Sequence, residues 1–201
     1  SPDKQDIYIT VNITEGEKYT ISDVKLAGDL KLPETELEPL LKLKKGDTFN
    51  RTSITQTSQA ISDRLSNEGY AFANVNAVPE INKEALTAAF TFFVDPGRRV
   101  YVRRINLTGN TRTKDKALRR EMRQLESSWY AGDKIKRSKE RLDRTQFFEN
   151  VEIETPAVPG STDQVDVNIN VTERSTGSVQ FGAGLSSNDG VVLGFNVSQQ
   201  N

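Results

Sequence analysis

The sequence predicts an α+β fold built from a tandem repeat and followed by a β-hairpin, and three observations support this prediction. Residues 15–29 reappear as 96–110 at an offset of 81 residues, with glycines and apolar residues in matching places. Each copy then shows the same order of patterns, β-α-α-β-β. The last segment, 175–201, alternates apolar with small or polar residues and has Asp189 as its one charged residue.

In the first repeat, alternation over 19–26 predicts a strand, and Pro33 suits the first turn of a helix whose apolar face holds Leu37, Leu40 and Leu41. A second helix is marked by Ile54, Ile61 and Leu65 and should stop near Gly69. The expected closing strands are 72–78 and 85–94.

The second repeat is expected to follow the same plan. Its strands are predicted over 100–107, 151–158 and 165–171. Apolar spacing places Leu118, Met122 and Leu125 on the inner face of its first helix, and Ile135, Ser138 and Leu142 on that of its second. Two helices on a three-stranded mixed sheet then bury one core per repeat.

The repeat sets the expected domain boundaries. Residues 1–14, with Ile7, Ile9, Val11 and Ile13, match the closing strand and indicate the end of a preceding repeat. Full repeats are expected over 15–95 and 96–174, and 175–201 is a separate segment. Because the chain starts and stops within a pattern, we expect it to be a fragment of a larger protein.

Composition excludes several classes of chemistry. The 201 residues include no cysteine and no histidine, which excludes disulfides, thiol nucleophiles, imidazole bases and the usual zinc ligands. Neither Gly182-Ala183-Gly184 nor Ser187-Asn188-Asp189-Gly190 completes a nucleotide or calcium motif. No run of 18 apolar residues and no signal peptide are visible. We therefore predict no enzyme, no cofactor and no metal.

Charge is distributed unevenly along the chain. The net charge of −1 combines an acidic first repeat with a basic segment, 98–144, which holds 16 basic and 6 acidic residues. This segment suits an acidic or phosphate-bearing partner, or else a solvated helical face. Trp129 and Tyr130 there leave nucleic-acid binding as a rival, but the balanced total charge and the matching aromatic Phe49 favour packing. We predict no nucleic-acid partner.

With three strands per repeat, the strand after the second helix should lie at a sheet edge. Edge strands present unpaired N–H and C=O groups to any extended peptide. The alternative is an edge that is solvated or covered by a neighbour. The candidate edges are 72–78 and 151–157, with these residues singled out: Phe72, Asn74, Val75, Val78, Val151 and Ile153.

The tail pattern resembles the strands of membrane β-barrels. Two strands of about ten residues flank a turn, with an apolar face and a face of glycine and serine. The alternative is an ordinary amphipathic hairpin packed on a domain. The glycine and serine on the second face and the near absence of charge favour barrel strands, and Val179, Phe181 and Leu185 mark the apolar face of the first one.

Several motifs resemble the polypeptide-transport-associated (POTRA) domains of the BamA family of outer-membrane β-barrel assembly factors. The motifs lie at 98–105, 109–111, 118–126, 147–151 and 171–177, and the resemblance covers essentially the whole chain, with the first full repeat matching less distinctively. The resemblance implies a periplasmic module that receives unfolded outer-membrane protein precursors and passes them to a barrel in the same polypeptide. The first tail strand would then lie at the barrel's lateral seam. TamA-type factors and two-partner secretion transporters are the related alternatives.

The resemblance also implies a docking site for a BamD-like assembly lipoprotein on the last repeat. The matching positions are Arg119, Arg123 and Glu126, while a basic position of that surface is Asn106 here. On one continuous helix the three charged residues would lie within about 60° of each other. The alternative is an intrahelical Arg123–Glu126 pair.

Overall fold

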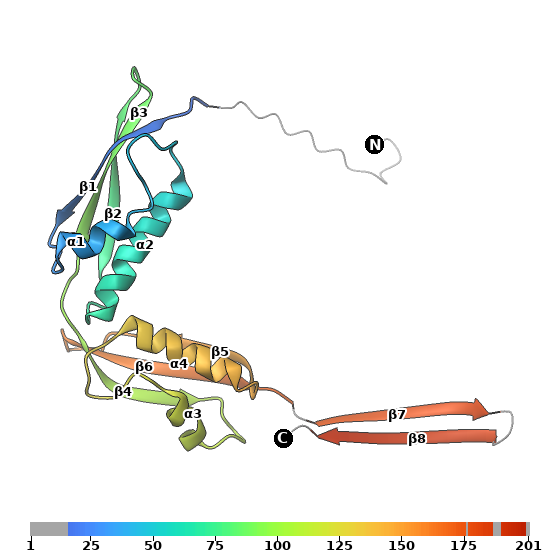
Figure 1. Ribbon diagram of the computed structural model, residues 1–201. Helices are drawn as coiled ribbons and strands as arrows, with labels where there is room; N and C mark the ends of the chain where they lie inside the picture. Colours follow the sequence, from blue (N-terminus) through green and yellow to red (C-terminus); the bar gives the residue numbers. More distant parts are fainter. Residues whose placement is uncertain (1–15, 176, 187–189, 200–201) are drawn as a thin grey trace, which may run out of the picture. The chain divides into compact units, whose positions relative to one another are not determined.

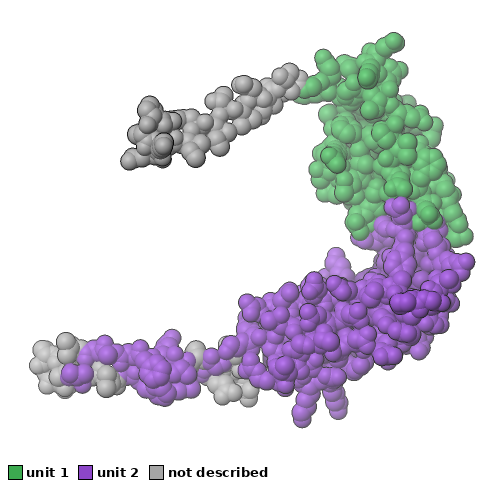
Figure 2. All heavy atoms as spheres, turned by 180° about the vertical axis from the view of Figure 1, so that it is seen from behind, with its two compact units in different colours: residues 1–61, 75–95 green, residues 62–74, 96–201 purple. Residues whose placement is uncertain are grey.

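The computed structural model describes residues 16–175, 177–186 and 190–199 (Figure 1). The predicted end of a preceding repeat, 1–14, lies outside these residues. The chain divides into two compact units, one of residues 1–61 and 75–95 and the other of residues 62–74 and 96–201 (Figure 2).

The first repeat contains two helices and a three-stranded sheet. Its elements are β1 (Thr20–Gly28), α1 (Glu34–Leu37) continued by the 3-10 turn η1 (Glu38–Leu40), α2 (Arg51–Asn67), β2 (Asn74–Asn82) and β3 (Thr87–Asp95). The strand order is β1-β3-β2, with β1 parallel to β3. The inner face of the sheet supplies much of the core, in which Phe90 and Phe92 are buried.

The second repeat has the same architecture. Its elements are β4 (Tyr101–Thr108), α3 (Asp115–Glu121), α4 (Gly132–Arg144), β5 (Phe148–Glu154) and β6 (Gln164–Glu173). The order is β4-β6-β5, with β6 parallel to β4 and antiparallel to β5. Ser138 and Leu142 are fully buried, as predicted for the inner face of α4. The predicted α+β repeat with a mixed three-stranded sheet is therefore confirmed.

The loop before the second helix binds the outer edge of the first strand in both repeats, through the same three backbone hydrogen bonds. In the first repeat they join Ile21 N to Asp47 O, Gly46 N to Ile21 O and Phe49 N to Tyr19 O. At an offset of 81 the second repeat has Val102 N to Ser128 O, Ser127 N to Val102 O and Tyr130 N to Val100 O. The strand registers also shift at matching places, between Ile21 and Asp23 and between Val102 and Arg104.

A glycine lies at the end of the first strand of each repeat, Gly28 as the last residue of β1 and Gly109 directly after β4, because no side chain fits there. Gly28 and Gly109 have φ values of 94° and 88°, in the left-handed region. A Cβ atom on either one would strike the carbonyl oxygen of the neighbouring central strand, Val94 or Val171. These close contacts explain why the glycines recur at the repeat offset.

The first helix of the second repeat is shorter than predicted. Helix α3 ends at Glu121, and Met122 has extended backbone with φ −69° and ψ 139°. Leu125 therefore does not face inward, and 66% of its surface is exposed. The prediction of one continuous helix through Glu126 was wrong because the chain after Met122 turns to follow β4.

The strand boundaries also differ from those predicted. Strand β2 begins at Asn74 and continues to Asn82, so Phe72 precedes it. Strand β5 begins three residues earlier than expected, at Phe148, and ends at Glu154. Ala157 instead makes an isolated bridge with Val165.

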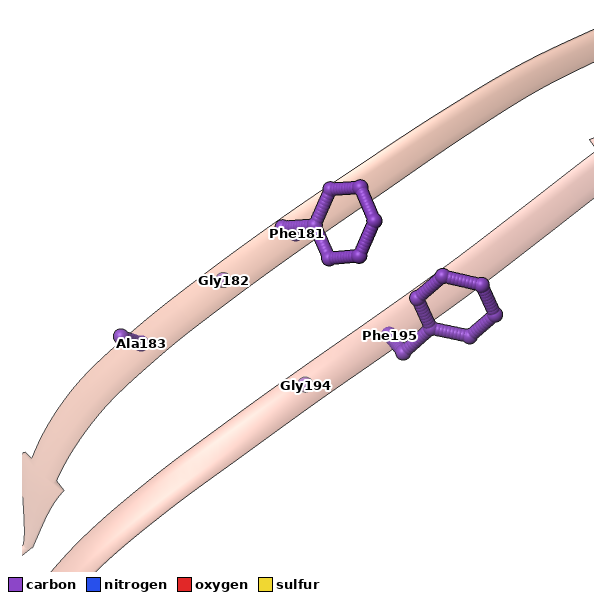
Figure 3. Close-up of a pocket in the computed structure, with 5 residues that line it drawn as sticks. All are labelled: Phe181, Gly182, Ala183, Gly194 and Phe195. Atoms are coloured by element: carbon purple, nitrogen blue, oxygen red, sulfur yellow. The ribbon is translucent and has the colours of Figure 1, made fainter.

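The tail forms the predicted hairpin, β7 (Gly177–Ser186) and β8 (Gly190–Gln199), in antiparallel register. The expected turn residues 187–189 lie outside the described residues. Phe181 and Phe195 pair across the strands with ring centroids 5.1 Å apart, and Figure 3 shows them beside Gly182, Ala183 and Gly194. Phe181 is 80% exposed, so this apolar face has no packing partner among the described residues.

Candidate functional site

The three predicted docking residues lie on α3 and on the segment that follows it. Arg119 is on α3, whereas Arg123 and Glu126 lie beyond its end. The Glu126 carboxylate accepts a hydrogen bond from Ile105 N at 2.8 Å, and the Arg119 guanidinium donates one to Ile105 O at 3.1 Å. Arg119 Nη1 lies 3.4 Å from Glu126 Oε1. We call the Arg119–Glu126 pair bonded to Ile105 the clasp.

Arg123 has a different role from the other two. Its guanidinium donates to the carbonyl oxygens of Arg120 and Met122, at 3.4 and 3.1 Å. Glu126 forms its ion pair with Arg119, so the alternative of an intrahelical Arg123–Glu126 pair does not hold. Asn106, at the position that departs from the family, donates from Nδ2 to Asn168 Oδ1 at 2.9 Å. It thus joins two strands of the sheet.

A buried glutamine holds the segment after α3 in place. Gln124 is fully buried, and its Nε2 donates to Ser128 Oγ at 2.8 Å and to Trp129 O at 3.0 Å. Its Oε1 accepts from Ala131 N at 3.0 Å. Since a buried amide with all its partners fixes a local conformation, Gln124 determines where Leu125 and Glu126 project. Sequence reasoning passed over Gln124.

Both candidate substrate strands lie at sheet edges, as the strand orders show. Along β5 the direction of the backbone groups can be derived from β6. Asp166 N donates to Pro156 O, so even-numbered residues of β6 direct their groups toward β5. Glu152 pairs with Asn170 and therefore faces β6. The groups of Val151 and Ile153 consequently face outward.

The outer edge of β5 is already partly occupied. The Lys139 ammonium on α4 donates a hydrogen bond to Val151 O. The Val151 side chain is buried in the core, and the side chain of Ile153 packs against it. The open backbone groups of this edge are thus centred on Ile153.

Strand β2 contains Pro79, which has no N–H to donate. Because proline in a sheet is tolerated where its nitrogen faces away from the neighbouring strand, Pro79 indicates that Val75 and Ala77 also direct their backbone groups outward. Asn74 then faces β3. Val78 is 44% exposed and Phe72, just before the strand, 50% exposed.

The predicted tail residues lie on the hairpin. Val179 pairs with Val197, Phe181 with Phe195 and Leu185 with Val191. Val179 is 54% exposed. These residues belong to the two-stranded sheet β7-β8, whereas the clasp binds β4 of the second repeat's sheet.

A carboxylate that sequence reasoning missed anchors the loop after β4. Glu173, at the end of β6, accepts hydrogen bonds from the N–H groups of Thr113 and Arg112 and from the Thr111 hydroxyl. Hydrogen bonds from Thr113, with those from Thr111 and Arg112, lower the pKa of Glu173 to about 2. The signal available in the sequence was the pairing of two motifs, 109–111 and 171–177.

The aromatic residues considered for nucleic-acid stacking have packing partners. Trp129 lies edge-on to Tyr101 at 6.2 Å, and the Arg99 guanidinium lies 4.5 Å from its ring centroid. In the first repeat Phe49 stacks on Phe90 at 5.7 Å. Tyr130, which corresponds to Phe49 at the offset of 81, is buried in the core of the second repeat. The repeated aromatic position therefore has a structural role in both copies.

Two searches of the described residues have a negative result. None of their helices is both long and apolar enough to cross a membrane. Within the same residues, no group of three or more carboxylate, histidine or cysteine side chains is arranged to hold a metal ion.

Comparison with known proteins identifies the repeat. The POTRA family model, described as a surface antigen variable number repeat, matches residues 19–97 and 100–174. The protein named outer membrane protein assembly factor BamA from Neisseria meningitidis serogroup B is 40% identical over 199 residues, which are 98% of this chain and 25% of that protein. BamA of Buchnera aphidicola is 31% identical over 99% of this chain and 32% of its own length.

Solved structures agree in sequence and in fold. The crystal structure of Haemophilus influenzae BamA POTRA3-5 is 43% identical, with a TM-score of 0.73 over 77% of this chain and 61% of that one. BamA from Haemophilus ducreyi lacking POTRA domains 1-3 is 40% identical, with a TM-score of 0.71 over 91% of this chain and 35% of that one.

The chain spans only about a quarter to a third of the length of these curated relatives. The relatives are assembly factors, and the prediction of a non-enzymatic protein is confirmed at the level of the family. Two matched repeats account for most of the chain. It therefore belongs to the POTRA family, as the periplasmic POTRA region of a BamA-type outer-membrane protein.

Proposed function

We propose that this chain is the part of the outer-membrane protein assembly machine that binds unfolded β-barrel precursors by strand addition. Residues 15–95 and 96–174 would be the penultimate and last POTRA domains, 1–14 the end of a preceding one, and 175–201 the first strands of a membrane barrel. The single observation that supports binding is the pair of edge strands, β2 and β5, with outward-facing backbone groups.

Strand addition suits substrates of many sequences. Backbone hydrogen bonds do not depend on side-chain identity, and alternating side chains of the added strand need only shallow contacts. Substrate would pass from these edges to the barrel strand that contains Val179, Phe181 and Leu185, whose apolar face fits lipid or a neighbouring strand. No nucleic acid takes part in this proposal.

Proline substitution tests the edges, if it is placed at outward-facing groups. Proline at Glu152 would break the sheet's own bonds to β6, so Ile153→Pro and Ala77→Pro are the informative changes. A photo-cross-linker at the exposed Glu152 or Asn76 reports capture of an unfolded barrel precursor. We expect each proline to reduce cross-linking at its own edge about tenfold. Ile153→Ala and Ala77→Gly, which keep the N–H, are the controls, and undiminished capture by the proline variants would contradict strand addition.

We also propose that the last repeat docks an assembly lipoprotein through Arg119, Arg123 and Glu126. A mixed cationic and anionic surface favours a partner with the reciprocal charges. Because Arg119 and Glu126 also bind Ile105, replacing them alters β4 as well as the surface. A charge reversal at Glu126, such as Glu126→Lys, would therefore not separate docking from changes in β4.

Arg123→Glu is the cleaner test of docking. Its guanidinium contacts carbonyl groups of its own segment, so reversal of charge should leave the fold unchanged. We expect the lipoprotein Kd to rise about tenfold or more in titration. Arg137→Glu, on the exposed face of α4, is the control for total charge. Equal affinity of the Arg123 variant would remove this residue from the docking surface.

A further inference from the structure

Strand β4 shows how an extended segment can pair with its outer edge. The chain's own residues 127–130 lie along it and make three backbone hydrogen bonds, to Val100 and Val102. This pairing stops at the register shift between Val102 and Arg104. The first half of the edge is thus covered by a loop segment of the same chain.

Side chains close the second half of the same edge. Ile105 directs both its N–H and its C=O away from β6, and the clasp binds them through Glu126 and Arg119. Backbone groups two residues further along a strand point the same way, so those of Leu107 also face outward. From Ile105 to Thr108, β4 therefore has outward-facing backbone groups, and two side chains bind those of Ile105.

The clasp is suited to displacement. The side chains of Arg119 and Glu126 are 47% and 42% exposed, and exposed ion pairs contribute little to stability. An extended segment can replace both caps, because its own carbonyl can accept from Ile105 N and its own N–H can donate to Ile105 O. No bond to Ile105 is lost in the exchange.

We propose that the outer edge of β4 from Ile105 to Thr108 is a further binding site for an extended segment of unfolded protein, closed in the free chain by the clasp. The inference rests on the proposed function, since it assumes that such segments bind strand edges. The two clasp residues also belong to the proposed lipoprotein surface. A partner that draws either side chain away from Ile105 therefore opens the site.

The test uses the full chain and a synthetic peptide with the sequence of β8, residues 190–199, which pairs by backbone bonds with β7. A photo-cross-linker at Thr108 reports binding at β4, and one at Asn76 reports binding at β2. In Arg119→Ala/Glu126→Ala we expect the Thr108 cross-link to rise about threefold or more, with the Asn76 cross-link unchanged. Asp133→Ala/Arg137→Ala, which removes another exposed pair of opposite charges, should leave both unchanged.

A second variant separates capping from charge. Glu126→Gln keeps an oxygen that can accept from Ile105 N, so its Thr108 cross-link should stay close to that of the wild type. Amide exchange at Ile105 should accelerate in the double alanine variant and much less in Glu126→Gln.

The outcomes distinguish this site from the proposed function. If the Thr108 cross-link does not rise in the double alanine variant while Asn76 still captures peptide, the β4 site is wrong and strand addition stands. If neither position captures peptide in any variant, the proposed function fails first. An equal rise with Glu126→Gln would overturn the capping role.

Discussion

The two repeats cap the same backbone position with charges from different places. In the first, Val24 N donates to Asp23, one residue earlier in the strand, at 3.0 Å; in the second, the equivalent Ile105 N donates to Glu126 on the loop. At the offset of 81, Asp23 corresponds to Arg104, and Glu126 corresponds to Lys45. An anion is thus retained near this N–H while its place in the sequence changes.

The comparison separates scaffold from surface. Backbone bonds between loop and strand, the register shift and the closing glycine are common to both copies, so the repeat needs them to fold. Both repeats bind this N–H with a carboxylate, but the carboxylate comes from a different position of the repeat in each. In the second repeat the cap is built from one side chain of α3, Arg119, and one of the following loop, Glu126, which makes it open to competition by a partner.

The largest expected effect comes from swapping the two residues that lie buried under the loop before the second helix in each repeat. Leu43, 3% exposed, and Gln124, fully buried, occupy equivalent positions. Gln124→Leu would leave Ala131 N and Trp129 O without partners, and Leu43→Gln would bury an unpaired amide. Each should cost about 2–4 kcal/mol in its own repeat.

The single tryptophan, Trp129, makes it possible to tell which repeat each substitution destabilises. Its fluorescence in urea titration reports the second repeat, and amide exchange in β3 reports the first. Destabilisation of both copies by equal amounts in either variant would contradict independent loop cores. Gln124→Glu, similar in size, distinguishes loss of the Nε2 donor from loss of volume.

A smaller effect tests what the repeats share. Thr57 and Ser138 are both fully buried, and each hydroxyl accepts a backbone N–H from the loop, from Lys42 at 2.9 Å and from Arg123 at 2.8 Å. Thr57→Val and Ser138→Ala should each cost about 1–3 kcal/mol, measured in the same urea titrations. A large cost in one repeat and none in the other would show that the common bond is not part of the scaffold.

The sequence predicts the repeat well because apolar spacing and recurring glycines reflect local and core constraints. It fails at the end of α3, since residues 118–126 are mostly good helix formers and only tertiary bonds of Gln124 and Ser138 terminate the helix. The first repeat held a usable signal: Pro39 follows the end of α1, and the helical turn stops at Leu40, so that the extended Leu41 corresponds to Met122 at the offset of 81. The clasp was not predictable, because its target is a backbone group on another strand.

Acid should act on the second repeat through Glu173. The central strands match at an offset of 77, since Gly28 meets Val94 and Gly109 meets Val171, so the counterpart of Glu173 in the first repeat is Pro96, which cannot ionise. The pKa of Glu173 is lowered from 4.5 to about 2 by the hydrogen bonds from Thr113, Thr111 and Arg112. A carboxylate whose pKa is lower in the folded than in the unfolded protein stabilises the fold at any pH above its pKa in the unfolded protein. For Glu173 this stabilisation is lost as the pH falls from about 4.5 toward 2. Amide exchange at Arg112 and Thr113 should accelerate over that window.

The matched variant is Glu173→Gln, which keeps one acceptor but cannot ionise. Its Arg112 and Thr113 amides should exchange faster than in the wild type at neutral pH and change less between pH 4.5 and 2. An unchanged pH dependence in this variant would assign the acid sensitivity to another group. The pKa of Asp166 is also lowered, mainly by its hydrogen bond from Arg103. At Glu121, desolvation raises the pKa, but the hydrogen bonds and charges of Arg141 and Arg120 together outweigh it, so the pKa is lowered.

The smallest expected effect tests whether the two caps are equivalent. The Asp23 side chain is half exposed and pairs with Lys25 at 3.1 Å, and its pKa is lowered mainly by the hydrogen bond from Lys25. Asp23→Ala should therefore change the urea midpoint little, because exposed charges contribute little to stability. Exchange of the Val24 amide should nevertheless accelerate about threefold to tenfold, as should that of Ile105 in Glu126→Ala. If Val24 exchange is unaffected, the cap belongs to the second repeat alone, and the clasp there is a specialised surface feature and not a part of the POTRA scaffold.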